Sequence, residues 1–462
     1  MSFTSRVKIE DLINNGSILV HKDGNHGAKY PRTEEFGEVG VPFLTAKLLD
    51  SSGNIDLLNA PRLATEKAKK FTFGFVQTED VLLSHNATVG RVAVMPQVAE
   101  PILIGTSLTH FRLDKSKILP TYLAAYFSGK DFQDQLAAVM SQTTRNQVPI
   151  TSQRKLYIEL PSIDIQTEIV KHIDSIDNKI RLNNQINQTL ESIAQAIFKS
   201  WFIDFEPVRA KIAAKQEGKD PERAAMCAIS GKSEAELEQM AKEDFAELQA
   251  TAALFPDELV DSELGEVPKG WELQQIKDIA KYCTNKISLK DLTLENYIST
   301  ENMLPEKKGI EKASSLPKAN SVPAFRKGNI LVSNIRPYFK KIWLSSFDGG
   351  HSNDVLNFEV LEKETEEYLY NLIYRDSFFD QMMASSKGSK MPRGDKKAIM
   401  DFQIVTSSVT LRKLYSKKVR KFYSQQNSIE IENQILTSLG DTLLPKLLSG
   451  EMDMLGLQGE GA

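Results

Sequence analysis

The sequence predicts an α+β protein in which two similar globular units, each a mixture of short strands and helices, are separated by two long antiparallel coiled-coil helices. Three observations predict this fold. The second half of the 462-residue chain repeats the plan of the first at an offset of about 246 residues, which implies pseudo-twofold symmetry. Each half ends in a long helical pattern with an apolar period of about 3.5 residues. The apolar share of 41% and the charged share of 26% are ordinary for a globular protein.

Shorter segments recur in the same order in both halves. Residues Asp80–Ser84 correspond to Asn329–Ser333, and each pattern predicts a buried strand that enters a polar loop. Residues Tyr122–Tyr126 correspond to Tyr368–Leu372, and each leads into a short helix. Each half then has a polar, basic loop and a short strand before its long helix: loops Ser141–Pro149 and Ser385–Arg393, strands Leu156–Leu160 and Ile399–Val405. Chance does not supply four matches in one order, so we predict an internal duplication.

The two long helices carry a narrow seam whose residues step alternately by four and three. The seam consists of Ile169, Ile173, Ile176, Ile180, Asn183, Asn187, Leu190, Ala194 and Ile197 in the first helix, and Tyr415, Val419, Phe422, Gln426, Ile429, Asn433, Leu436, Gly440 and Leu443 in the second. A single apolar stripe needs a partner, so we expect the helices to pair with each other, antiparallel by the pseudo-symmetry. Asn187 and Asn433, with Asn183 and Gln426 nearby, would penalise wrong registers. The alternative is that each helix packs on its own globular unit as ordinary core.

Charge is unevenly distributed although the net charge is only −4. The connector Asp204–Glu266 holds 16 acidic and 7 basic residues, whereas residues 1–160 hold 18 basic and 16 acidic, and residues 271–410 hold 20 and 18. Lys and Arg cluster within the second unit, between positions 387 and 397. Such clusters suit loops that follow a phosphate backbone, although most charge clusters are solvated surface.

Several enzyme classes lack their signatures in this sequence. The Asn/Asp-Pro-Pro-Tyr/Phe tetrapeptide of amino-methyltransferases is absent, and the six histidines show no zinc spacing. Gly231-Lys232-Ser233 looks like the end of a phosphate-binding loop, but Met226 stands where glycine is required. We therefore expect no catalytic residue and no metal in this chain. Two cysteines and the lack of an apolar run of membrane-spanning length predict a cytoplasmic protein with no membrane contact.

Particular segments resemble the specificity subunits of type I restriction–modification systems. Ile165–Val170 and Ile197–Pro207 look like the central region of that family, and Leu443–Gly450 looks like its C-terminal end. Ser84–Arg91 and Thr144–Pro149 resemble recurrent loops of its first target recognition domain. The resemblance covers nearly the whole chain. The second unit departs from the family pattern, because its loop at positions 333–338 lacks the glycine of the first.

The resemblance implies an arrangement of domains along the chain. It predicts target recognition domain 1 at 1–161, a long spacer helix at 162–203, an acidic helical connector at 204–270, target recognition domain 2 at 271–406, a second spacer helix at 407–450 and a flexible tail at 451–462.

The resemblance also implies a function in DNA recognition. Each recognition domain reads half of a bipartite double-stranded DNA target, and the helices set the spacer. The helices also dock two methyltransferase subunits that use S-adenosylmethionine to methylate adenine N6. Restriction motor–nuclease subunits that use ATP and Mg join for cleavage, so the chain itself is expected to hold no cofactor. Two alternatives remain open: a DNA-binding adaptor or inactive relic without a methyltransferase partner, and a structural coiled-coil scaffold.

Side chains suited to base edges and phosphates occupy the basic and polar loops. Arg, Asn and Gln pair with guanine and adenine in the major groove, whereas lysines hold phosphates. The alternative for each loop is that its Asn, Thr and Gly residues only shape turns. The predicted DNA contacts are His85, Asn86, Thr88, Arg91, Thr143, Thr144, Arg145, Asn146 and Gln147 in the first unit, and Asn334, Arg336, Tyr338, Lys340, Lys387, Ser389, Lys390, Arg393 and Lys396 in the second.

Overall fold

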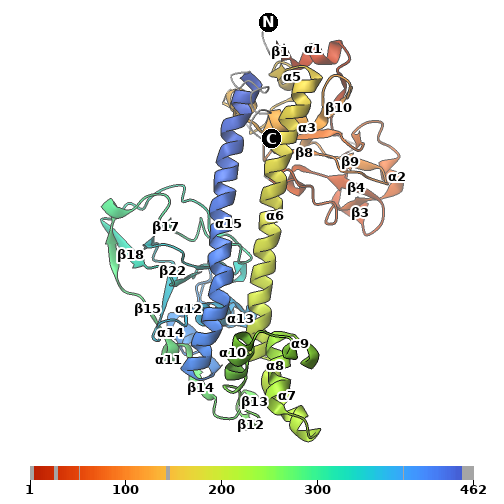
Figure 1. The fold of residues 1–462 in the computed structure, drawn as a ribbon. Coiled ribbons are helices and arrows are strands. Elements are labelled where there is room, and N and C mark those ends of the chain that lie inside the picture. Colours follow the sequence, from red (N-terminus) through yellow and green to blue (C-terminus); the bar gives the residue numbers. More distant parts are fainter. Residues whose placement is uncertain (1–4, 25–29, 51, 142–145, 389, 450–462) are drawn as a thin grey trace, which may run out of the picture. The chain divides into compact units, whose positions relative to one another are not determined.

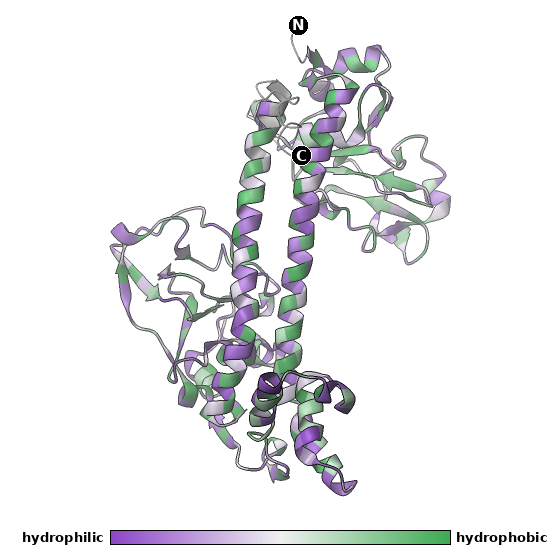
Figure 2. Cartoon of the chain, viewed as in Figure 1, coloured by the Kyte–Doolittle hydropathy of each residue, from purple (hydrophilic) through white to green (hydrophobic). Residues whose placement is uncertain are grey.

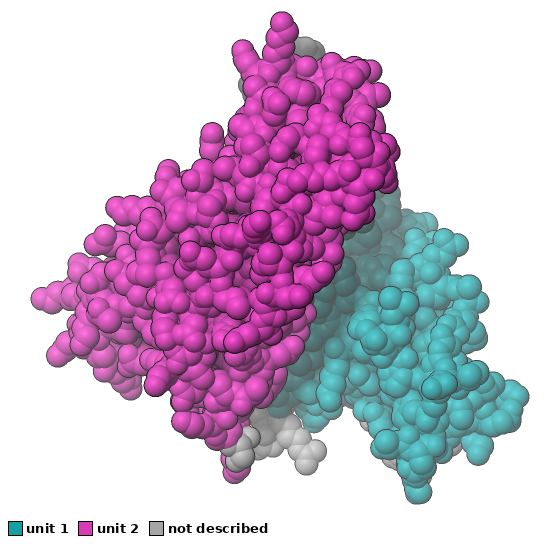
Figure 3. Space-filling model, turned by 90° about the horizontal axis from the view of Figure 1, so that it is seen from below, with its two compact units in different colours: residues 1–183, 431–462 teal, residues 184–430 magenta. Residues whose placement is uncertain are grey.

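The fold mixes helices and strands, as the sequence predicts, and contains two very long helices (Figure 1). The structure is a computed structural model that describes residues 5–24, 30–50, 52–141, 146–388 and 390–449. The chain divides into two compact units, coloured separately in Figure 3. The first unit comprises residues 1–183 and 431–462, and the second comprises residues 184–430. Each unit therefore contains one globular part and a stretch of both long helices.

The first unit is built on three sheets. A four-stranded antiparallel sheet has the order β2-β10-β7-β8, a five-stranded sheet has the order β3-β5-β4-β9-β6, and β1 pairs with β11. Its elements are β1 (Ser5–Lys8), α1 (Ile9–Asn14), β2 (Ile18–Asp23), η2 (Thr33–Glu35), β3 (Phe36–Gly37), β4 (Val41–Leu44), η3 (Ala46–Leu48), β5 (Arg62–Leu63), α2 (Thr65–Ala68), β6 (Phe75–Val76), β7 (Val81–Ser84), β8 (Val92–Val94), β9 (Ile102–Ile104), β10 (Leu108–Leu113), α3 (Pro120–Ser128), α4 (Lys130–Met140), α5 (Ile150–Gln153), β11 (Tyr157–Leu160) and the start of α6 (Ile163–Phe202).

After its stretch of α6, the second unit continues through a helical connector into its own sheets. The connector contains α7 (Glu206–Gln216), α8 (Pro221–Ser230), α9 (Glu234–Glu238), α10 (Lys242–Ala252) and a hairpin of β12 (Leu259–Ser262) and β13 (Gly265–Pro268) that the sequence patterns do not predict. The globular part contains β14 (Glu272–Gln275), α11 (Ile276–Ile279), β15 (Ala280–Tyr282), β16 (Lys286–Ser288), η4 (Leu289–Asp291), β17 (Tyr297–Ile298), β18 (Ser321–Phe325), β19 (Ile330–Ser333), η5 (Pro337–Phe339), β20 (Ile342–Leu344), β21 (Gly349–His351), β22 (Val355–Val360), α12 (Glu366–Tyr374), α13 (Asp376–Ala384), α14 (Lys396–Met400), β23 (Gln403–Thr406) and the start of α15 (Val409–Ser449).

One predicted strand is wrong at its start. The sequence predicts an extended segment at Ile399–Val405, but Ile399 and Met400 end α14 and the strand begins at Gln403. The reason is a local cap: the Asp395 carboxylate accepts hydrogen bonds from the backbone N–H groups of Lys397 and Ala398, which starts a helix at that point.

The same topology occurs in both units. The sheet order β2-β10-β7-β8 recurs as β15-β22-β19-β20, and the pair β1–β11 recurs as β14–β23. The series α3, α4, α5, β11, α6 recurs as α12, α13, α14, β23, α15. Helices α3 and α12 begin at Pro120 and Glu366, and α6 and α15 begin at Ile163 and Val409, so both pairs are displaced by 246 residues. Each unit closes its own core around these elements.

The two long helices run antiparallel within each unit. In the first unit, the Asn183 side-chain amide donates to Asn433 Oδ1 and to Glu432 Oε2, each at 2.8 Å, while Leu443 joins the core near the start of α6. In the second unit, Gln426 donates to the Asn187 carbonyl at 2.8 Å, and Tyr415 OH donates to the Ala194 carbonyl at 3.0 Å. Within each unit, residues later in α6 therefore contact residues earlier in α15, as expected for antiparallel helices.

The predicted seam coincides with the less exposed face of both helices, along which Figure 2 shows hydrophobic and hydrophilic residues interspersed. Every seam residue is buried or half-buried, whereas the apolar Ile431, Ile435 and Leu439 lie off the seam and are exposed. The spacing of about 3.5 residues, and not hydrophobicity alone, therefore predicts which face of each helix is less exposed. Near the helix ends the seam also packs on the globular parts, since Ile169 belongs to the first unit's core and Val419 to the second's.

Candidate nucleic-acid interface

In the first unit, two loops far apart in sequence lie against each other at the end of β7. An isolated bridge joins Asn86 to Gln147. The Val148 N–H donates to the His85 carbonyl at 2.8 Å, and the Ala87 N–H donates to the Asn146 carbonyl at 3.3 Å. The structure thus brings together the described residues of both loops that the sequence marked as DNA contacts. We call the segments 85–91 and 146–148 the first loop pair.

A buried chain of polar side chains lies under the first loop pair. His21 Nε2 is 3.1 Å from Gln153 Oε1, and the Gln153 amide donates to Thr109 Oγ1 and to the Val148 carbonyl, each at 3.0 Å. Thr109 Oγ1 is in turn 2.8 Å from His85 Nδ1. Burial lowers the pKa of His21 to about 4, so its ring is neutral at pH 7. The chain connects β2, β10 and the roots of both loops, which holds the loop pair in one arrangement.

The predicted contacts of the first unit differ in how they are placed. His85 is buried and its Nδ1 lies 2.8 Å from Thr109 Oγ1, which indicates a role in positioning the loop, while its contact with DNA stays a prediction. Arg91 is half-buried and its guanidinium donates to the Leu49 carbonyl at 2.6 Å. Asn86, Thr88 and Gln147 are half-buried and Asn146 is exposed. Thr143, Thr144 and Arg145 lie outside the described residues.

The second unit builds an equivalent loop pair from different side chains. An isolated bridge joins Ile335 to Arg393, and the Arg336 N–H donates to the Pro392 carbonyl at 2.8 Å. Arg393 lies 246 residues after Gln147, and Ile335 follows Ser333 at the end of β19 as Asn86 follows Ser84 at the end of β7. We call the segments 334–340, 387–388 and 390–393 the second loop pair. Its position in the fold repeats that of the first.

Cations dominate the second loop pair. Lys387 forms an ion pair with Asp395 at 2.9 Å, Arg393 with Asp354 at 3.0 Å and Lys340 with Asp376 at 3.0 Å. These ion pairs orient the cations, yet Lys387 and Arg393 remain exposed. Four further predicted contacts are placed as follows: Arg336, Tyr338, Lys390 and Lys396 are exposed. Asn334 is buried at the root of its loop, and Ser389 lies outside the described residues.

Sequence patterns do not reveal the residues that hold the first loop pair. Gln153 is fully buried, but it ends a four-residue helix that is too short to show a period. His21 and Thr109 lie on strands that mix apolar and polar residues, so neither side chain stands out in the sequence. The one signal in the sequence is a polar residue at a strand position that faces the core.

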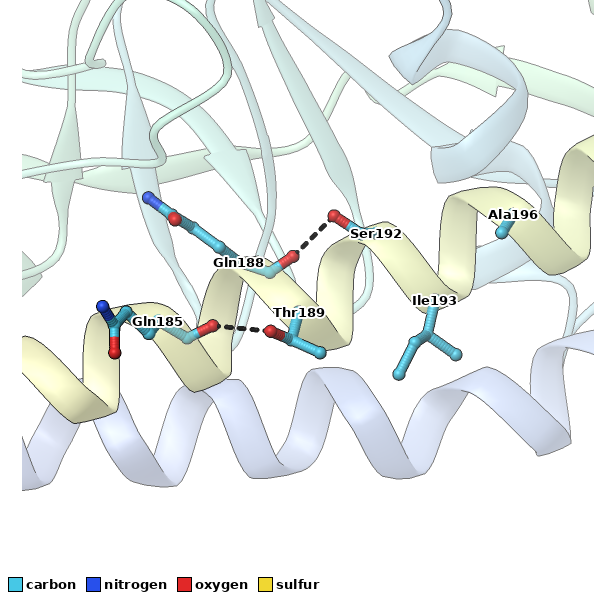
Figure 4. Close-up of a pocket in the computed structure, with 6 residues that line it drawn as sticks. All are labelled: Gln185, Gln188, Thr189, Ser192, Ile193 and Ala196. Carbon is cyan, nitrogen blue, oxygen red and sulfur yellow. Dashed lines mark hydrogen bonds between the residues drawn. The ribbon is translucent and has the colours of Figure 1, made fainter.

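A shallow depression on the second unit's stretch of α6 is lined by neutral side chains only (Figure 4). The hydroxyls of Thr189 and Ser192 donate to the carbonyls of Gln185 and Gln188 on the same helix, at 2.9 and 2.8 Å. Among the described residues, no group of His, Cys, Asp and Glu could hold a metal ion. Within the same residues, no helix is both long and apolar enough to cross a membrane.

Comparison with known proteins gives a consistent set of relatives. Residues 7–192 match the type I restriction modification DNA specificity domain. The HindI type I restriction enzyme specificity subunit of Haemophilus influenzae is 28% identical over 397 residues, covering 79% of this chain and 84% of that protein. The MjaIX specificity subunit of Methanocaldococcus jannaschii is 22% identical, covering 92% and 90%. The crystal structure of the type I S subunit from M. genitalium matches with a TM-score of 0.47 and 14% identity, over 96% of each chain.

Proposed function

The chain belongs to the family of type I restriction–modification specificity subunits, and we propose that each of its two units reads one half of a bipartite DNA target. The observation that carries this proposal is the repeated loop pair. Two loops joined by an isolated bridge occur at the same place in both units, with polar side chains in one and cations in the other. A duplicated reading surface fits a target that has two parts.

The two loop pairs suit different contacts with DNA. In the first, Asn86, Asn146 and Gln147 carry side-chain amides, which pair with the edge of adenine in the major groove. In the second, Lys387 and Lys390 suit phosphates, whereas Arg336 and Arg393 suit guanine or phosphate. The first unit therefore depends more on base hydrogen bonds, and the second more on charge.

The long helices set the spacer between the half-sites in this proposal. Helix α6 has 40 residues and α15 has 41, which corresponds to about 60 Å at 1.5 Å per residue. One turn of B-DNA spans about 34 Å. Helices of this length suit half-sites centred one to two turns apart.

Methyltransferase subunits are the proposed partners of the helices and connector. A groove of about 810 Å³ lies in the second unit between α6, α8, α10 and α15. Its lining combines apolar Ile197, Leu248 and Phe422 with acidic Glu247 and basic Lys418, which suits an amphipathic helix. The partner would hold S-adenosylmethionine and the pocket for the extruded adenine, so this chain needs no catalytic residue. For restriction, motor–nuclease subunits would supply the ATP and Mg chemistry.

Methylation mapping tests the proposal directly. The chain is co-expressed with its methyltransferase subunit, and N6-methyladenine is mapped across the host genome. We expect methylation in a split motif, with one adenine per half on opposite strands. Exchanging residues 1–160 for those of a relative should change one half alone. A stable complex without methylation would favour an inactive relic, and no preference among DNA sequences would favour a scaffold.

A further inference from the structure

Two aromatic side chains project from the second loop pair. Tyr338 is 48% exposed and Phe339 is 36% exposed, and their ring centroids are 4.7 Å apart. Both belong to the single 3-10 turn η5. Adjacent exposed rings are unfavourable in water, so their position on a surface rich in cations calls for a partner that is both anionic and aromatic. DNA bases between phosphates have this chemistry.

The backbone holds this turn in a costly conformation. Arg336 and Lys340, which flank the turn, have φ of 50° and 51°, in the left-handed region that disfavours side chains other than glycine. Hydrogen bonds from outside the turn keep it there. The Glu306 N–H donates to the Phe339 carbonyl at 2.8 Å, and the Lys307 N–H donates to the Lys340 carbonyl at 3.0 Å. The rings are therefore presented by a pre-organised support.

Cations surround the support of the turn. Lys340 and Lys307 share the Asp376 carboxylate at 3.0 and 2.8 Å, and Lys341 Nζ lies 5.8 Å from the Phe339 ring centroid. Arg336 is exposed immediately before the turn. A duplex that approaches along these cations would bring its base steps to the two rings.

We propose that Tyr338 and Phe339 form an aromatic wedge that inserts into the second half-site and unstacks one base step. The wedge rests on the proposed function and deepens it. Apolar side chains on a rigid support are the known means by which proteins open a base step and kink the duplex. The loop of the first unit has Thr88, Val89 and Gly90 in the stretch that corresponds to η5, and none of these is aromatic. The unstacked step is therefore confined to one half of the target.

Fluorescence of 2-aminopurine tests the wedge. The probe is placed at successive steps of both half-sites in a duplex that carries the mapped motif, and the complex of the full chain with its methyltransferase subunits is added. Emission should rise several-fold at one step of the second half-site other than the methylated adenine, because extrusion of that adenine affects both halves alike. The double variant Tyr338→Ala/Phe339→Ala should lose this rise and bind roughly ten- to a hundredfold more weakly.

Two controls separate insertion of the rings from a loss of charge or of folding. The variant Tyr338→Phe/Phe339→Tyr keeps both rings and should keep the signal. The slope of log affinity against log salt should be the same in the alanine variant and the wild type, because no cation is removed. Both side chains are exposed, so equal melting temperatures should show intact folding. An emission rise that is absent from the second half-site, or that survives the alanine variant, would overturn the wedge while leaving bipartite methylation intact. Absence of any methylated motif would overturn the proposed function and the wedge together.

Discussion

The two units carry equivalent loop pairs, but the side chains beneath the loops are polar in the first unit and largely apolar in the second. Under the first loop pair, His21, Thr109 and Gln153 form a hydrogen-bonded chain. The equivalent positions of the second unit hold Tyr282, Leu356 and Ile399. The bridge between the loops is present in both. Strand order and the bridge therefore determine where the loops meet, whereas the polarity of the interior beneath them is free to change.

The attachment of each globular part to its stretch of α6 also differs between the units. In the first unit, Gln166 accepts from the Leu119 N–H at 2.9 Å and donates to the carbonyls of Lys117 and Pro161, each at 3.0 Å. In the second unit, Gln195 on α6 donates to Asn371 Oδ1 on α12 at 2.5 Å, and beside this bond Phe198, Trp201, Phe202, Tyr368 and Tyr415 form an aromatic cluster. Both units thus combine hydrogen bonds with apolar burial, since Ile169 belongs to the first unit's core, and the second unit adds packing between aromatic rings.

Removing the largest ring of the aromatic contact should have the largest effect. Trp201 is buried and packs edge-to-face on Phe255 at 5.4 Å. Trp201→Ala should lower the free energy of unfolding of the second unit by about 3–5 kcal/mol, because it leaves a large cavity. Urea unfolding monitored separately for each unit measures this change. Gln166→Leu is the matched variant of the first unit and should cost less, about 1–3 kcal/mol. Equal losses would contradict the contrast between the two attachments.

Exchanging the interiors tests whether each loop pair depends on its own. Gln153→Leu removes the centre of the polar chain and leaves Thr109 and His21 short of partners, at a cost of about 1–3 kcal/mol. Methylation should then become less selective in the first half of the motif alone. Ile399→Gln, the matched change, places an amide in an apolar site and should relax the second half alone. If either variant relaxed both halves, the units would not be independent readers.

Features that depend on local spacing could be predicted from the sequence, whereas features that depend on distant partners could not. The seam followed from its period, because repeated spacing along one helix is a local property that Ile173 and Phe422 share with their neighbours. Composition and the family resemblance together predict the loops. They do not predict the contact between the loops, because the bridge joins residues 61 positions apart, Asn86 and Gln147. The buried role of Gln153 depends on His21, 132 residues away, and no local pattern encodes such a partner.

Acid should destabilise the first unit through His21. Burial lowers its pKa to about 4 in the fold, from 6.5 in the unfolded chain. Between these values the unfolded chain binds a proton that the fold does not, so the stabilisation is present above pH 6.5 and is lost as pH falls toward 4. From pH 7 to pH 5 this group should lower the free energy of unfolding by about 2 kcal/mol. The His21 ring stacks on Phe111 with the centroids 4.6 Å apart, so His21→Phe keeps a ring at this place and should flatten the pH dependence by that amount. An unchanged pH dependence in this variant would show that His21 is not the group that titrates.

The smallest effect on stability should accompany a clear effect on the spacer. Asn183 and Asn433 hydrogen bond across the helix pair within the first unit. Asn183→Leu/Asn433→Leu removes both amides together. Glu432 loses the Asn183 donor but keeps its ion pair with Lys179 at 3.3 Å, so stability should change by about 1 kcal/mol or less. Apolar seams tolerate more than one register, and a buried polar pair disfavours the wrong ones. The double variant should therefore methylate motifs with more than one spacer length, which genome-wide mapping of N6-methyladenine reveals. Gln426→Leu is the matched variant of the second unit. Gln426 donates to a backbone carbonyl, which every residue possesses, so this variant should leave the spacer unchanged. A single spacer in the double variant would place the control of register in the globular parts, not in the seam.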